Sequence, residues 1–140
     1  MGEVRAKVKL TNAVDLGLAR RSMMAPGDVR SLEAHALVDT GAVSLILPSF
    51  VAEQLGLARP FKQVAEYADG RREEVDVTEP VLLEILGRST HEEALILGDE
   101  VILGQTTLEK TDLHVDCREQ RLFPNPAHPD QPVQKVKLLK

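Results

Sequence analysis

The sequence is poor in cysteine, in positive charge and in long apolar runs, and each shortage excludes a class of protein. The single cysteine, Cys117, cannot form a disulfide within the chain, so nothing requires an oxidising compartment. The formal net charge of −5 leaves no basic excess to neutralise phosphates, which argues against nucleic acid as a partner. No apolar run approaches membrane-spanning length, and the first residues lack the apolar core of a signal peptide. The expected compartment is the cytoplasm, with no membrane partner.

The chain has the size and composition of one globular domain, with 140 residues, 43% hydrophobic and 28% charged. Short apolar or alternating runs predominate, and no long amphipathic helix is present, so the fold is predicted to be mainly β with one or two short helices. Strands are predicted at residues 4–10, 14–18, 32–38, 43–47, 61–68, 71–77, 81–86, 93–97, 101–104, 113–116 and 120–123, and helices at 48–55 and 105–110.

Turn residues predict how some of these strands pair. Asp69-Gly70 between two strand-like runs is a strong hairpin signal, because a type I′ turn needs positive φ at both central residues. Residues 81–86 and 93–97 are expected to pair around 87–90, and residues 113–116 and 120–123 around Cys117.

The stretch from Ala36 to Pro48 is the most informative. An apolar run leads into Asp39, the chain turns on Thr40-Gly41, and a second apolar run follows. An ionisable side chain at the end of a buried strand is costly unless it is paired or used in chemistry. Aspartate and glycine are also ordinary turn residues, so an Asx-turn that only ends the strand explains the same pattern. These residues alone favour neither interpretation.

The order of motifs resembles that of the retropepsin-like aspartic proteases, the single-domain relatives of pepsin. The match covers Leu32 to Phe123. It consists of the apolar strand before Asp39-Thr40-Gly41-Ala42, a hairpin from Val64 to Val77 at the flap position, and Val101-Ile102-Leu103-Gly104 before a helical turn. The sequel from Thr107 to Asp116 is closer to cellular and bacterial members than to viral ones.

The resemblance implies a closed acid-protease-like barrel, one lobe per chain, with a hairpin flap. It implies that Asp39 is catalytic and that Thr40, Gly41 and Ala42 form the active-site loop, with the Thr40 hydroxyl bonding across a two-fold axis. The implied flap and substrate-binding residues are Tyr67, Ala68, Asp69 and Gly70. The implied supporting residues are Ile102, Leu103 and Gly104, the last packing beneath the Asp39 loop.

The implied activity is that of an aspartic endopeptidase, which needs no metal and no cofactor. Two aspartates share one proton, because like charges about 3 Å apart cannot both ionise. This chain has one Asp-Thr-Gly, so the implied partners are a second copy of itself and a polypeptide substrate. The protease domain is predicted at 1–123. The proline-rich segment 124–140 is predicted to be extended, and residues 4–10 and 133–139 are candidate strands of an inter-subunit sheet.

Departures from the viral pattern keep a second function open. Viral members pair an acidic residue with an arginine at the positions of Val43 and Gln105, and here both are absent. The flap tip is also unusually charged. The alternative is therefore a catalytically weak or inactive module of the same fold that binds peptides or dimerises. A phosphotransferase is discarded, since no second phosphate loop is present. The four histidines lack metal-ligand spacing, and Cys117 is expected to be a small buried hydrophobe.

Overall fold

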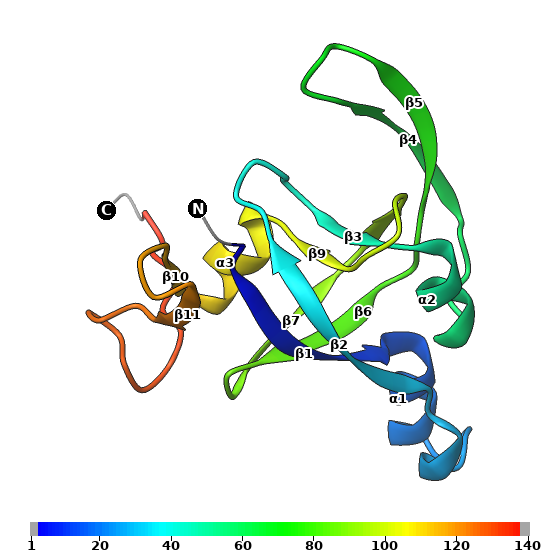
Figure 1. Cartoon of the computed structure of the whole chain (residues 1–140). Helices are drawn as coiled ribbons and strands as arrows, with labels where there is room; N and C mark the ends of the chain where they lie inside the picture. Colours follow the sequence, from blue (N-terminus) through cyan, green and yellow to red (C-terminus); the bar gives the residue numbers. More distant parts are fainter. Residues whose placement is uncertain (1–2, 138–140) are drawn as a thin grey trace.

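The computed structural model describes residues 3–137, and it is mainly β, as predicted (Figure 1). These residues form three short α-helices and one 3-10 turn, one α-helix more than the sequence predicts. The strands are β1 (Arg5–Asn12), β2 (Ser31–Val38), β3 (Leu45–Leu47), β4 (Phe61–Glu66), β5 (Arg72–Val77), β6 (Val81–Ile85), β7 (Arg88–Glu92), β8 (Ala94–Ile96), β9 (Ile102–Leu103), β10 (Leu113–Asp116) and β11 (Arg121–Pro124). The helices are α1 (Ala13–Arg20), η1 (Pro26–Asp28), α2 (Ser49–Gln54) and α3 (Gln105–Thr111).

Nine strands form one sheet in the order β4-β5-β8-β3-β9-β2-β1-β6-β7, and β10 and β11 form a separate hairpin. Among the described residues, no pairing joins β4 to β7 at the two ends of this order, so the predicted closure of the barrel is not detected. No helix in this part of the chain is long and apolar enough to span a membrane.

The core is built mainly from aliphatic side chains on alternate positions of the strands. Leu10, Leu45, Leu83 and Leu103 are fully buried, and each lies on a strand whose neighbouring side chains point to the opposite face. The same cluster includes side chains of α2, of α3 and of the β10–β11 hairpin. One core therefore fixes both helices and the hairpin against the sheet.

Residues 14–18 form part of helix α1, so the predicted second strand is wrong. The side chain of Asn12 accepts a hydrogen bond from the backbone N–H of Asp15 at 3.0 Å, which caps the helix. The amide of Asn12 also donates to the Leu55 carbonyl at 2.8 Å, and the carboxylate of Asp15 binds the Arg30 guanidinium. These distant partners stabilise a helix that the local alternation does not predict.

The strands after Val81 also pair differently from the prediction. β6 turns at Leu86 and Gly87 directly into β7, and both turn residues have positive φ, 49° and 75°. This is the conformation of a two-residue hairpin turn, but leucine rarely adopts it, so the sequence gives little sign of it. β8 pairs with β3 and β5 rather than with β6.

Strand β1 lies inside the sheet, between β2 and β6. Lys9 and Leu10 pair with both neighbours, so they have no free edge for the predicted inter-subunit sheet. Residues 126–131 form turns and bends rather than the extended segment expected from the prolines. Residues 133–137 contain no strand, and the end of the candidate strand 133–139 lies outside the described residues.

Candidate active site

Asp39 lies immediately after β2, where two strands hold the backbone. β2 pairs in parallel with β9, with Val38 opposite Leu103. The backbone N–H of Asp39 donates to the Leu103 carbonyl at 3.0 Å, which extends that ladder by one bond. The position of Asp39 is therefore determined by the end of a buried parallel pair rather than by a free loop.

The carboxylate of Asp39 makes the bond of an Asx-turn. The backbone N–H of Gly41 donates to Oδ1 at 2.9 Å, and the N–H of Ala42 donates to the Asp39 carbonyl at 3.1 Å. Asp39, Thr40 and Gly41 are all exposed in the single chain. Both interpretations of this motif are thus compatible with the structure, since the turn orients the carboxylate and leaves it accessible.

The Asp39 loop, residues 39–44, packs directly against Gly104. A Cβ atom placed on Gly104 would lie 2.5 Å from the Ser44 carbonyl oxygen and 2.7 Å from the carbonyl carbon of Val43, closer than side-chain atoms pack. The first two N–H groups of α3, of Gln105 and Thr106, donate to the carbonyls of Ala42 and Val43 at 2.8 and 3.0 Å. Close packing against Gly104 and hydrogen bonds from the N-terminus of α3 thus fix the position of the Asp39 loop.

The two residues before Gly104, Ile102 and Leu103, form strand β9. Leu103 is fully buried and Ile102 half-buried, and Ile102 pairs with both β2 and β3. β9 is therefore the strand that joins the two strands flanking the Asp39 loop. The residues from Asp39 to Ala42 and from Ile102 to Gly104 come together as one unit.

The β4–β5 hairpin projects from the body of the protein, on the side where the loop between β2 and β3 also emerges (Figure 1). Its tip contains the predicted flap residues Tyr67 to Gly70. Gly70 has a positive φ of 86°, but Asp69 does not, so the predicted type I′ turn is wrong. Asp69 instead accepts a hydrogen bond from the Arg71 N–H at 2.9 Å and bends the chain with its side chain.

The charges of the flap tip pair with one another. Arg71 lies over the Tyr67 ring at 4.6 Å and contacts Asp69 at 3.2 Å, and Arg72 contacts Glu66 at 2.8 Å. The four charged side chains are largely exposed, so each ion pair contributes little to stability. No residue of the tip lines a cavity that contains Asp39 or Thr40. The flap residues therefore share neither of these two cavities with the Asp39 loop.

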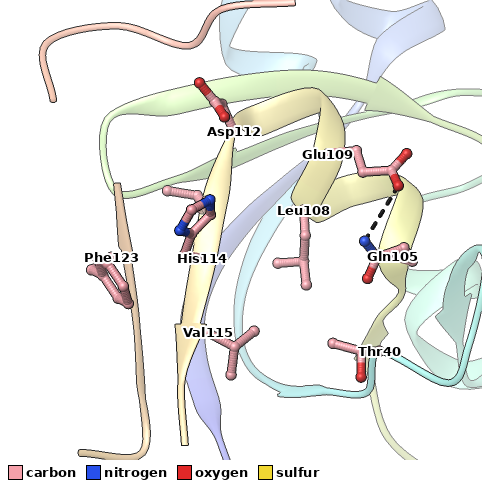
Figure 2. A pocket seen from close by; sticks show the side chains of 9 residues that line it. Thr40, Gln105, Leu108, Glu109, Asp112, His114, Val115 and Phe123 are labelled. Carbon is pink, nitrogen blue, oxygen red and sulfur yellow. Dashed lines mark hydrogen bonds between the residues drawn. The ribbon is translucent and has the colours of Figure 1, made fainter. Parts of the chain in front are cut away.

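Two cavities flank the Asp39 loop. The larger, of about 540 Å³, lies between Thr40, α3 and the β10–β11 hairpin (Figure 2). The smaller, of about 370 Å³, contains Asp39 itself together with the start of the chain. The wall of the larger cavity is mixed, with Leu108, Val115 and Phe123 beside polar side chains such as Gln105 and Glu109. The wall of the smaller is more apolar, with Val4, Leu37, Val38 and Val115.

The positions that carry the viral ion pair have other neighbours here. Val43 is 71% exposed. The side chain of Gln105 donates to Glu109 one turn later on α3 at 3.3 Å, the bond drawn in Figure 2. The chain therefore has no charged pair at these positions to fix the loop.

Several residues near Asp39 were not found from the sequence. His114 and Phe123 stack edge-to-face at 5.7 Å on the β10–β11 hairpin and line the larger cavity. Cys117 is exposed and lines the smaller cavity, so the expectation of a buried cysteine is wrong. Within residues 3–137, no three histidine, cysteine or acidic side chains are grouped so that they could hold a metal ion.

The chain is similar to solved structures of retroviral-type proteases. No protein-family model matches the chain, and no curated protein matches it. The EIAV protease in complex with the inhibitor HBY-793 is 26% identical, with a TM-score of 0.46 over 55% of this chain and 75% of that one. The retroviral protease-like domain of Ddi1 from Leishmania major is 15% identical, with a TM-score of 0.56 over 90% of both chains. The second likeness covers nearly the whole of both chains, and it shows that this chain has the retropepsin-like fold.

Proposed function

We propose that this protein is an aspartic endopeptidase that acts as a homodimer, with one Asp39 from each subunit. The observation that carries the proposal is the Asp39-Thr40-Gly41 turn. It is exposed at the end of a buried strand, and β9, Gly104 and α3 hold its backbone. These three supports hold an accessible carboxylate in a fixed position, as catalysis by Asp39 would require.

The proposed chemistry needs two carboxylates about 3 Å apart that share one proton. The ionised carboxylate takes a proton from water, and the resulting hydroxide attacks the peptide carbonyl carbon. The protonated carboxyl donates its hydrogen to the carbonyl oxygen. In the second half of the reaction, one hydroxyl of the gem-diol intermediate returns its proton to the ionised carboxylate. The protonated carboxyl gives its proton to the amine nitrogen as the C–N bond breaks, so one proton again lies between the two carboxyls. The two carboxyls titrate as a unit.

A second copy of the chain is the proposed source of the second carboxylate. Each chain has one such turn, and it is exposed. The two cavities beside it are lined in part by apolar side chains, such as Leu108 and Val38, which a partner could cover. In the described residues, β10 pairs only with β11, so its outer edge is free to extend the hairpin into a sheet across a two-fold axis. The Thr40 hydroxyl is then available to bond between the paired loops.

The β4–β5 hairpin is the proposed lid over the substrate. It stands out from the body and its tip, from Tyr67 to Gly70, is exposed or half-exposed. Closure would bring these residues over the Asp39 loop and exclude water from the reacting peptide.

The second candidate is a module of this fold that binds peptides or dimerises with little or no catalysis. It is favoured by the absence of a charged pair at Val43 and Gln105 and by a flap tip whose charges pair with one another. Cleavage of a polypeptide discriminates between the two candidates, because both can self-associate.

The test is cleavage of an unfolded polypeptide between pH 3 and 7 by the parent chain, by Asp39→Asn and by Asp99→Asn. Asp99 lies in an exposed turn and is the matched control. We expect the parent and the control to cleave best in mild acid, and Asp39→Asn to lose about 10²–10⁴-fold in rate. Sedimentation should give a dimer for all three. Equal cleavage by Asp39→Asn, or no cleavage by the parent at any pH in this range, would contradict the enzymatic proposal.

A further inference from the structure

The segment from Asn125 to Val133 contains no helix or strand, yet it is tied to the body at one carboxylate. This carboxylate is that of Asp112, directly after α3 (Figure 2). Asn125 Nδ2 donates to its Oδ1 at 3.0 Å, the Val133 N–H donates to its Oδ2 at 3.1 Å, and His128 Nδ1 lies 2.6 Å from Oδ2. The backbone N–H of Asn125 also donates to the Asp112 carbonyl at 3.0 Å.

Arg88 on β7 completes this arrangement from the opposite side. Its side chain is buried, and Nη1 donates to the carbonyls of Thr111 and Asp112, both at 3.0 Å. Nη2 donates to the His128 carbonyl at 2.7 Å. The last carbonyls of a helix have no partner within the helix, and a cation there is favourable. The Arg88 guanidinium therefore caps the C-terminus of α3 and also binds the segment from Asn125 to Val133. We call Arg88, Asp112, Asn125, His128 and Val133 the C-terminal clamp.

The backbone conformation of Asp112 suits glycine better than aspartate, so the bonds of the carboxylate account for an aspartate at this position. Its φ is 56°, the left-handed conformation that follows many helices and that glycine adopts most easily. An aspartate there is disfavoured unless its side chain makes compensating bonds. The hydrogen bond from Asn125, with those from Val133 and His128, lowers the pKa of Asp112 to about 2, so its charged form is the one that the clamp binds.

The helix that ends at the clamp begins at the Asp39 loop. α3 has seven residues, too few for a helix to be stable without outside contacts. Its first N–H groups, of Gln105 and Thr106, donate to the carbonyls of Ala42 and Val43 in that loop. The two ends are about 10 Å apart at the rise of an α-helix. The clamp and the Asp39 loop are thus the two attachments of one short rigid element.

We propose that Asp112 is a positioning residue: by tying the segment from Asn125 to Val133 onto the end of α3, it holds the helix in the orientation that keeps the Asp39 loop in place. The effect on the loop is independent of catalysis. The further consequence, that the clamp supports cleavage, rests on the proposed function. In this arrangement the segment from Asn125 to Val133 stabilises the position of α3, and through α3 that of the Asp39 loop.

Asn125→Asp tests the proposal, because it replaces the donor to Asp112 with a second carboxylate. The charged and titratable groups that otherwise face Asp112 are the Arg88 guanidinium and the His128 imidazole. At pH 7 the two carboxylates should repel and open the clamp. In mild acid they can share a proton, which restores a donor between them. Gln131→Glu is the matched control, since it adds the same charge in the same segment at an exposed position.

The measurement is amide hydrogen exchange at Gln105 and Thr106, corrected for the intrinsic rate at each pH. We expect Asn125→Asp to lower their protection on the order of tenfold at pH 7 and to regain it near pH 4, while Gln131→Glu matches the parent. If only residues 125–133 exchange faster, the clamp fastens the tail alone and the proposal is wrong. Faster exchange throughout the chain would mean global unfolding.

His128→Ala is the second variant, since it removes one of the donors and leaves the others. It should lower protection at the same two amides by a smaller factor, with β1 unchanged, and unchanged protection at both amides would overturn the proposal. Where cleavage is measurable, kcat should fall with KM nearly constant in both variants. The exchange result holds whether or not the chain cleaves peptides, so failure of the inference is distinguishable from failure of the proposed function.

Discussion

Replacing Gly104 with alanine perturbs the contact between the supporting strand and the Asp39 loop. The backbone of Gly104 has a φ of −93°, which alanine adopts without strain, so the change acts through packing alone. The new Cβ would lie 2.5 Å from the Ser44 oxygen and 2.7 Å from two atoms of Val43. To bring these atoms to 3.4 Å, where ordinary contact begins, the loop must move by about 0.7–0.9 Å.

Such overpacking in a closely packed site costs about 1–3 kcal/mol in the free energy of unfolding. For a domain of this size, that cost lowers Tm by roughly 3–12 °C. A displacement approaching 1 Å at a catalytic group costs up to about 10²-fold in rate. Gly104→Ala should therefore lose more activity than its loss of folded protein explains.

The assay pairs thermal unfolding with polypeptide cleavage well below the lower Tm. Gly17→Ala is the matched control, because a Cβ on Gly17 meets nothing within 4 Å and the residue lies inside α1. Alanine there should stabilise the helix by up to about 1 kcal/mol and leave cleavage unchanged. If Gly104→Ala unfolds at the parent's temperature and cleaves at the parent's rate, the account of the Asp39 loop resting on Gly104 is refuted.

Three further predictions concern stability. Leu103→Ala removes a fully buried side chain and should lower the free energy of unfolding in urea by about 2–5 kcal/mol; a loss below 1 kcal/mol would contradict its place in the core. Burial raises the pKa of Glu92 despite the nearby Lys110, so stability falls as pH rises above the usual value of 4.5. Glu92→Gln should thus be more stable than the parent at pH 7 but not below pH 4.5, and equal urea midpoints at pH 7 would refute this. Because the pKa of Asp112 is lowered from 3.8 to about 2, mainly by Asn125, its stabilisation is complete above 3.8 and lost as pH falls through 2. The stability gap between the parent and Asp112→Asn should therefore be constant from pH 7 to 5 and shrink below pH 3.8, whereas a gap that grows in acid would contradict the assignment.

The elements that the sequence predicts correctly are those with local signals. The Asp69-Gly70 turn places a hairpin between β4 and β5, and apolar runs of strand length give β2 and β9. Asp39 and Gly104 were found because each sits in a short contiguous motif. Even there, the turn type was wrong, since Asp69 uses its side chain rather than a positive φ.

The elements that the sequence misses depend on residues far along the chain. Helix α1 is stabilised by bonds from Asn12 to Leu55 and from Asp15 to Arg30, which no local pattern reveals. The clamp at Asp112 joins β7, α3 and the C-terminal segment, so its members are separated by up to 45 positions. The flap position was predicted from order alone, and its relation to Asp39 stays a prediction.

The central claim is that Asp39 is half of a site completed by a second copy. The direct measurement adds increasing Asp39→Asn chain to a fixed amount of parent chain, equilibrates the subunits and follows cleavage. If both carboxylates are needed, an equal amount of Asp39→Asn should capture half of the parent subunits in inactive mixed dimers and reduce the rate to about half. Asp99→Asn added in the same way should raise the rate instead. A cleavage rate that is unaffected by added Asp39→Asn would show that each chain acts alone and would contradict the account.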